Sequence, residues 1–219
     1  SLAHLYDESK ILKKYLNDFL IHGSFATLDY VKGWSDLDTL LIIKNDTMLS
    51  PEKLFQLRKK ILLLEKNLYK IDKLQHHGFI YCTENDFKFY QSFLVPVETI
   101  ILSKSLFRKS INTIYYFRDK NYWKKKFDDF LKLFEDTYNT KVFKHHGINN
   151  RYLLENFKDK NTMYQLKYFL CLLMGMPCYY LECKGDPTYK KFSYDKIKDL
   201  FSEDWSIIKV ATKIRKLWS

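Results

Sequence analysis

The chain has 219 residues, 46% of them apolar and 17% aromatic, and a formal net charge of +11. This composition excludes a disordered chain, and the length is enough for one large or two small domains. The apolar runs are far shorter than a membrane span, so no membrane partner is expected. Cysteines without paired C-x-x-C spacing predict reduced thiols rather than zinc, and we expect a cytoplasmic location; they are Cys82, Cys171, Cys178 and Cys183.

The positive charge favours polyanionic partners, including nucleoside triphosphates. The basic residues are spread along the chain in short runs, which is typical of solvated helix faces. A nucleic-acid partner is therefore possible but not favoured on charge alone. A homodimer is left open.

The first predicted elements surround a glycine-serine turn and an acidic pair. Apolar side chains at helical spacing predict a helix over Leu5 to Ile21 that leads into Gly23 and Ser24. Asp36 and Asp38 follow, and successive side chains on a strand point to opposite faces, so both carboxylates are expected on one side of a strand.

This pattern has a chemical interpretation and a plain one. Two carboxylates held close repel unless a cation lies between them, and hard oxygen ligands suit Mg2+. Gly23 allows backbone N–H groups to approach a phosphate, and Ser24 adds a hydroxyl donor. In the plain interpretation, an ordinary turn precedes a solvated strand edge. The apolar run from Leu40 to Ile43 favours a site, because it continues the strand into a core.

Further elements of the first half follow from caps and turns. Ser50-Pro51-Glu52 predicts the start of a helix that reaches about Tyr69. Gln75 to Cys82 and Asp86 to Phe93 predict a pair of strands joined by a turn at residues 83–85. Another helix is expected from Pro96 through Leu106.

From about Ile111 onward the pattern is helical throughout. Helices are predicted over Tyr122 to Thr137, Asn150 to Phe157, Thr162 to Met174, Tyr194 to Phe201 and Trp205 to Leu217. Gly175-Met176-Pro177 and residues 184–187 are predicted to break the helices. We therefore expect an α+β domain with a small mixed sheet over residues 1–110 and an all-α helical bundle over residues 111–219.

Gly23-Ser24, eleven intervening residues and then Asp36-Leu37-Asp38 resemble the signature of the DNA polymerase beta-like nucleotidyltransferase superfamily. The match includes Ser35 ahead of the first aspartate. The resemblance implies that Gly23, Ser24 and Ser35 bind the nucleotide, and that Asp36 and Asp38 are catalytic and hold two Mg2+ ions. The helical second half resembles the substrate-binding domains of kanamycin nucleotidyltransferase-like enzymes.

The family pattern is incomplete at one position. Most active members carry a third carboxylate on a neighbouring strand, and residues 72–81 show no clear equivalent, since Asp72 comes early. His76 or His77 could take this place as a metal ligand or proton acceptor, with His77 as the weak catalytic candidate. Alternatively, these histidines simply begin a strand. Glu84 and Asp86 lie in or beyond the turn, and Glu155 and Glu182 are further candidates for the general base.

The sequence thus predicts a Mg2+-dependent nucleotidyltransferase that uses a nucleoside triphosphate and releases pyrophosphate. Its acceptor would be a hydroxyl group of a small molecule, such as an aminoglycoside-like sugar. Two alternatives stay open: transfer to a protein or RNA, as an antitoxin-like enzyme would perform, and a degenerate regulatory module that binds nucleotide without turnover. The sequence does not identify the nucleotide, because bases are read by pocket shape.

Overall fold

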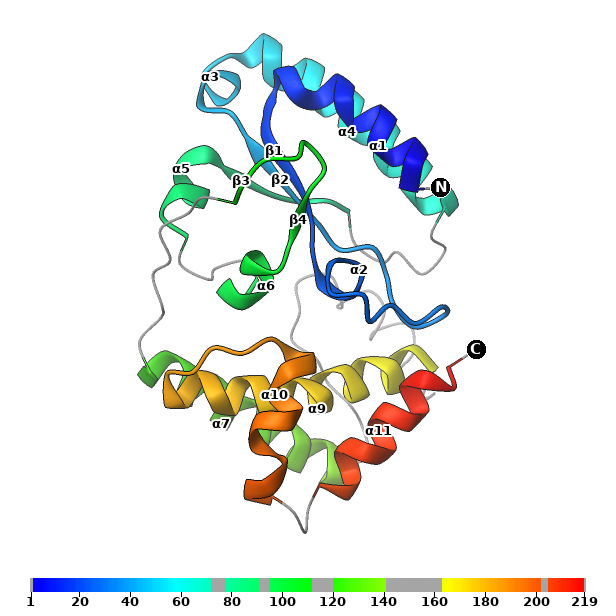
Figure 1. The fold of residues 1–219 in the computed structure, drawn as a ribbon, viewed down its shortest axis with the longest axis vertical. Coiled ribbons are helices and arrows are strands. Elements are labelled where there is room, and N and C mark those ends of the chain that lie inside the picture. The colour runs from blue at the N-terminus through cyan, green and yellow to red at the C-terminus, as the bar shows by residue number, and fades with distance from the viewer. Residues whose placement is uncertain are drawn as a thin grey trace. The chain divides into compact units, whose positions relative to one another are not determined.

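A computed structural model describes residues 2–71, 78–90, 95–111, 120–140, 163–201 and 205–218 (Figure 1). The chain divides into two compact units, residues 1–117 and 118–219. The first unit contains a four-stranded mixed sheet with helices, and the described part of the second unit is helical. The fold is therefore α+β, as predicted. None of the helices that the structure describes has the length and apolarity needed to cross a lipid bilayer.

The first unit begins with α1 (Leu2–Lys10), the 3-10 helix η1 (Ile11–Lys14) and β1 (Leu16–Ile21). The single helix predicted from Leu5 to Ile21 is thus wrong in its second half. Phe19 and Leu20 are fully buried and belong to the clusters on opposite faces of the sheet. A strand that is covered on both faces carries a continuous apolar run, which periodicity does not distinguish from a buried helix.

The sheet has the order β3-β2-β1-β4. β1 runs antiparallel to β2 (Thr39–Ile43) and to β4 (Lys104–Ser105), whereas β2 runs parallel to β3 (Ile80–Thr83). The parallel pair is joined through α3 (Asn45–Met48) and α4 (Pro51–Ile71). The predicted helix start is confirmed: the Ser50 hydroxyl accepts a hydrogen bond from the Lys53 N–H at 3.3 Å.

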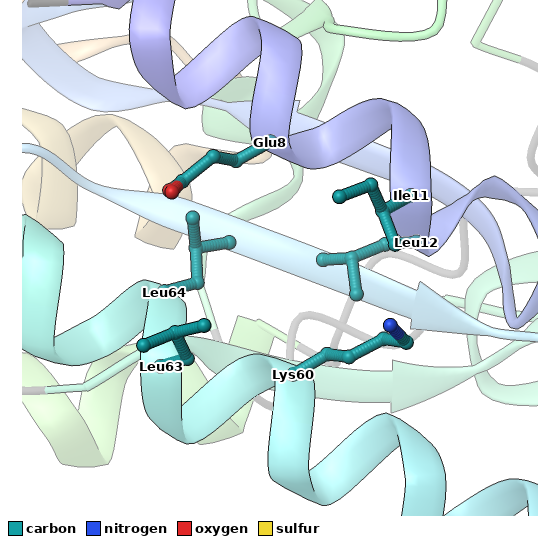
Figure 2. Close-up of a pocket in the computed structure, with 6 residues that line it drawn as sticks. All are labelled: Glu8, Ile11, Leu12, Lys60, Leu63 and Leu64. Carbon is teal, nitrogen blue, oxygen red and sulfur yellow. The ribbon is translucent and has the colours of Figure 1, made fainter.

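Helix α4 covers one face of the sheet, where Leu41 packs with Leu57 and Ile61. Figure 1 shows α1 beside α4, and the two helices enclose a pocket of about 80 Å³. Figure 2 shows its lining, which is Glu8, Ile11, Leu12, Lys60, Leu63 and Leu64. Ligand sites usually measure about 300–1,000 Å³, so this pocket is too small for a nucleotide.

The segment after β3 differs from the prediction. Residues 83–85 do not form a hairpin turn but begin α5 (Glu84–Lys88), because Thr83 and Asp86 form a capping box. The Thr83 hydroxyl accepts from the Asp86 N–H at 3.1 Å, and Asp86 Oδ2 accepts from the Thr83 N–H at 3.0 Å. Residues 75–77 and 91–93 of the two predicted strands lie outside the described residues.

Helix α6 (Val97–Ile101) then covers the second face of the sheet together with α5. The helix predicted through Leu106 ends earlier, because Lys104 and Ser105 pair with β1 as strand β4. Val97 and Ile100 pack there against Leu40 and Ile42. The sheet of the first unit therefore has its own core on each face.

The second unit contains α7 (Lys120–Thr140), α9 (Met163–Lys184), α10 (Lys190–Ile197), η2 (Lys198–Phe201) and α11 (Ser206–Lys216). The predicted break at Gly175-Met176-Pro177 is wrong, since α9 continues through Pro177. Proline removes one backbone hydrogen bond of the helix, and packing of α9 against α7 compensates for this loss. In that packing, the rings of Phe130 and Tyr179 stack with their centroids 4.6 Å apart. The break at Gly185 is confirmed, and this residue has φ +77°. The predicted helix Asn150 to Phe157 lies outside the described residues.

Candidate functional site

The end of β1 and the start of β2 bring the glycine turn and one aspartate together. The His22 N–H donates a hydrogen bond to the Asp38 carbonyl at 3.0 Å, which continues the pairing of β1 with β2. Gly23 has φ +65° and begins the short helix α2 (Gly23–Ala26). A Cβ atom at Gly23 would lie 2.3 Å from Asp38 Oδ2. The carboxylate of Asp38 therefore occupies the space that any side chain at position 23 would need.

The two aspartates precede the strand on which they were predicted, since β2 begins at Thr39. This part of the prediction is wrong, because the residue pairing of β2 with β1 ends at Thr39, and beyond it Asp38 is joined to the end of β1 by the hydrogen bond from His22. The expected alternation nevertheless persists: Leu37 is 3% exposed and joins the core, whereas Asp36 and Asp38 are half-buried. Burial of Leu37 anchors the loop between the two carboxylates.

Ser24 and Ser35 have different surroundings. Ser24 is half-buried in α2, and its carbonyl accepts from the Asp29 N–H at 3.0 Å. Ser35 is buried, and its hydroxyl accepts from the Val31 N–H at 3.0 Å while its own N–H donates to the Val31 carbonyl at 2.8 Å. Ser35 thus shapes the turn that precedes Asp36. Its contact with a nucleotide stays a prediction.

The segment between the turn and the aspartates is fixed by its own side chains. The Thr27 hydroxyl contacts the Gly23 carbonyl at 3.0 Å and forms a short hydrogen bond with the Asp29 carboxylate. The rings of Phe25 and Tyr30 lie 4.3 Å apart. These local contacts hold the loop that separates Gly23 from Asp36.

Gly78 and Phe79, which precede β3, lie at the same end of the sheet, because β3 pairs in parallel with β2 and Ile80 lies opposite Leu40. Glu65 of α4 fixes this approach: its Oε1 atom accepts from the Phe79 N–H at 3.1 Å and from the Tyr81 hydroxyl at 3.0 Å. A Cβ atom at Gly78 would lie 2.4 Å from the same oxygen. Burial and the Glu65 charge raise the pKa of the Tyr81 hydroxyl, which keeps it protonated as a donor.

The candidates for the third position are only partly placed. Asp72, His76 and His77 lie outside the described residues, as does Glu155. Glu182 is buried on α9 in the second unit. Within the part of the chain that the structure describes, no three His, Cys, Asp or Glu side chains gather as a metal-ligand cluster.

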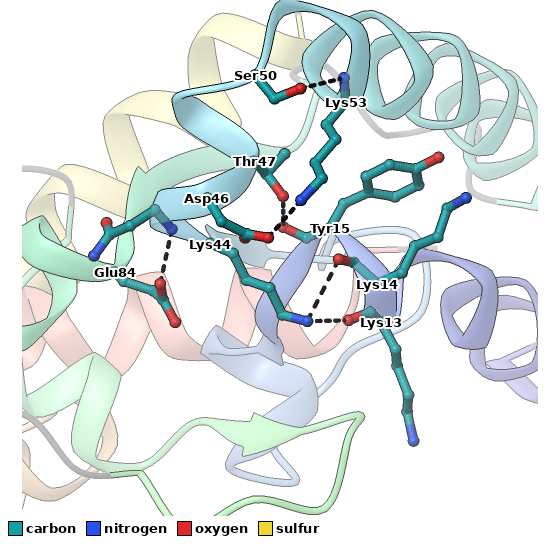
Figure 3. Close-up of polar contacts among 10 residues, drawn as sticks. Lys13, Lys14, Tyr15, Lys44, Asp46, Thr47, Ser50, Lys53 and Glu84 are labelled. Atoms are coloured by element: carbon teal, nitrogen blue, oxygen red, sulfur yellow. Dashed lines mark hydrogen bonds and ion pairs between the residues drawn. The ribbon is translucent and has the colours of Figure 1, made fainter.

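Glu84 and Asp86 are excluded from the third position, because they follow the opposite end of β3. Glu84 instead accepts a hydrogen bond from the N–H of Asn45, just beyond β2, at 2.7 Å. The Glu84 side chain is drawn in Figure 3. Asp86 is held in the capping box of α5. The neighbouring contacts of Figure 3, such as Thr47 Oγ1 to the Tyr15 carbonyl at 3.0 Å, fasten this far end of the sheet.

Two further polar residues come from elements at the end of the sheet where Asp38 lies. His22 is 3% exposed and directly precedes Gly23. Glu98 is 6% exposed in the first turn of α6, the helix that precedes β4, and Lys104 of β4 pairs with Ile21. Glu98 does not stand out in the sequence, since an acid in a first helical turn is ordinary. The available signal was its position within the apolar run Val97 to Ile101.

Chemically, Asp36 and Asp38 supply hard oxygen atoms, which suit Mg2+ as part of a ligand set that phosphate and water complete. The Asp38 side chain fills the space at Gly23 that a Cβ atom would need, so this carboxylate is held directly against the glycine turn. By the chemistry of their side chains, Asp36 and Asp38 therefore suit the predicted cation, and its binding stays a prediction. In comparisons with known proteins, no protein-family model, no curated protein and no solved structure matches the chain.

Proposed function

We propose that this chain is a Mg2+-dependent nucleotidyltransferase that transfers a nucleoside monophosphate from a nucleoside triphosphate to a hydroxyl group of a small-molecule acceptor. One observation carries the proposal: the side chain of Asp38 lies against the backbone of Gly23, which has no room for a Cβ atom. A phosphate-binding turn and a metal-binding carboxylate are required side by side in such a reaction. Asp36, half-buried two residues earlier, supports the same interpretation.

Each residue has a separate task in this proposal. Asp36 and Asp38 hold Mg2+, which when bound neutralises charge on the triphosphate. The N–H groups in the first turn of a helix have no partner within that helix, so those of α2 can donate to phosphate oxygens, with the Ser24 hydroxyl beside them. The acceptor oxygen forms a bond to the α-phosphorus as the bond to pyrophosphate breaks. The hydroxyl proton passes to a base, for which His77 stays the predicted candidate.

The test is pyrophosphate release from each of the four ribonucleoside triphosphates with Mg2+, in the presence and absence of hydroxylated acceptors that include sugars and an RNA. Asp36→Asn and Asp38→Asn are each expected to reduce acceptor-dependent release at least about 100-fold, because a charge in the reaction centre is lost. Asp46→Asn is the matched control, since Asp46 is exposed and pairs with Lys53 at 2.6 Å. This control should leave release unchanged.

Two outcomes would overturn the proposal. If pyrophosphate release persists in Asp38→Asn, the carboxylates do not have the role assigned to them. The second outcome is triphosphate binding that needs Mg2+ and Asp38 but leads to no pyrophosphate release with any acceptor. It would mean that the chain is a degenerate nucleotide-binding module and not an enzyme. Binding is measured separately by the thermal shift that Mg2+ and triphosphate produce.

A further inference from the structure

The second unit carries a groove of about 500 Å³ along α11 that the proposed nucleotidyl transfer does not use. Its lining combines three lysines of α11 with the aromatic side chains of Tyr194 and Trp205. Ligand sites commonly measure about 300–1,000 Å³, so the groove has room for a nucleotide or two. Its chemistry is cationic along α11 and aromatic near the start of that helix.

The cations form a row. Lys209, Lys213 and Lys216 are spaced i, i+4 and i+7, so they lie on one face of α11, and all three are exposed. At 1.5 Å rise per residue, the row extends about 10 Å along the helix axis. No carboxylate of the described residues forms an ion pair with these three lysines. Within the described part of the chain, the row therefore carries positive charge at regular intervals without a carboxylate partner.

The aromatic part of the groove is held in place. The Tyr194 hydroxyl donates to the Met174 carbonyl at 3.0 Å, which fixes its ring against α9. Trp205 meets Tyr194 edge to face, with ring centroids 6.1 Å apart, and is half-buried. Ile208 is buried and contributes apolar lining. A flat ligand thus has an ordered aromatic surface beside the lysine row.

We propose that this groove binds single-stranded nucleic acid, with lysine contacts to successive phosphates and a base stacked on Trp205. A regular row of cations matches a chain of phosphates better than a single anion, and aromatic rings that are partly exposed beside such a row can serve as a platform for unpaired bases. This inference goes beyond the proposed function, because it concerns a different unit and needs neither Mg2+ nor Asp38. It gives a reason to include RNA among the acceptors tested.

The experiment is fluorescence anisotropy of the full chain with a labelled single-stranded RNA dodecamer, repeated with DNA of the same sequence and with the duplex. The triple variant K209Q/K213Q/K216Q is expected to bind at least tenfold more weakly. K124Q/K125Q/K132Q is the matched control, since it removes the same charge from exposed positions on α7. Three phosphate contacts on a single strand also predict that the groove variant lowers the slope of log K against log salt by about 2.

A second pair of variants tests stacking. Trp205→Ala is expected to weaken binding about tenfold, within the range for loss of one stacked base, whereas Trp205→Phe retains most of the affinity. Circular dichroism checks folding, and if Trp205→Ala unfolds, the lysine variants alone test whether the groove binds the nucleic acid.

Equal weakening of binding by the two lysine triple variants would overturn the proposal that the groove is the binding site, because general charge attraction would then explain the binding. Tighter binding of the duplex, or binding only to anionic lipid vesicles, would overturn single-stranded nucleic acid as the ligand.

Discussion

At the residue scale, Gly23 combines a left-handed backbone with contact to a carboxylate. Replacement by alanine strains the φ of +65° and drives a Cβ atom into Asp38 Oδ2. Backbone strain and overpacking together are expected to lower the free energy of unfolding by about 2–4 kcal/mol. Displacement of the Asp38 carboxylate should also abolish the thermal shift produced by Mg2+ and triphosphate. Urea unfolding and thermal shift measure the two effects separately.

Gly185 provides the control, because it also has a positive φ, +77°, but lies outside the candidate site. A Cβ atom there would meet only the flexible end of Lys120, with Cε at 3.0 Å. Gly185→Ala is expected to cost about 1 kcal/mol from strain alone and to retain the nucleotide shift. If both variants retained the shift, the close contact between Gly23 and Asp38 would have no part in binding.

At the element scale, the capping box formed by Thr83 and Asp86 joins the end of β3 to the start of α5. The Thr83 hydroxyl also donates to Asp86 Oδ2 at 2.7 Å, so the two side chains act as a unit. Thr83→Ala is expected to lower the free energy of unfolding by about 1 kcal/mol, and Asp86→Ala by a similar amount. Because each variant breaks the same cap, the double variant should cost less than the sum. A double-mutant cycle from urea unfolding measures this coupling, and strict additivity would contradict it.

The same elements show what could be predicted from the sequence. Helix α4 was predictable because its start is local: Ser50 and Pro51 mark it whatever packs around it. The approach of Gly23 to Asp38 was anticipated from a motif, although both aspartates precede β2. By contrast, β1 resembled a helix because both of its faces are buried, and the capping box at Thr83 resembled a turn. Both errors concern tertiary burial or a reciprocal side-chain contact, which periodicity does not report.

The position of Glu98 could not be predicted for a related reason. A motif places residues that are close in sequence, whereas Glu98 reaches this end of the sheet through the pairing of β4 with β1. That pairing involves only two residues and leaves little trace in the sequence. The parallel register of β3, fixed by Glu65, is likewise a long-range feature.

At the scale of the whole molecule, the first unit has the components of an independent domain. Its sheet is covered by Leu57 and Ile61 of α4 on one face and by Val97 and Ile100 of α6 on the other, all from residues 1–117. A chain of this length can bury a core of its own. We therefore expect a fragment of residues 1–117 to fold cooperatively and to bind triphosphate with Mg2+.

Trp34 makes this expectation measurable, because it is the only tryptophan of that fragment and is 4% exposed. Its fluorescence should change in a single urea transition as its environment becomes aqueous, and Mg2+ with triphosphate should move the midpoint to higher urea. The Asp38→Asn fragment should fold but lose the ligand-induced change. A gradual, non-cooperative change would mean that the first unit needs residues 118–219 to fold. A cooperative transition without any ligand effect would instead mean that nucleotide binding needs groups beyond the first unit, since the fold around Gly23 and Asp38 would be intact.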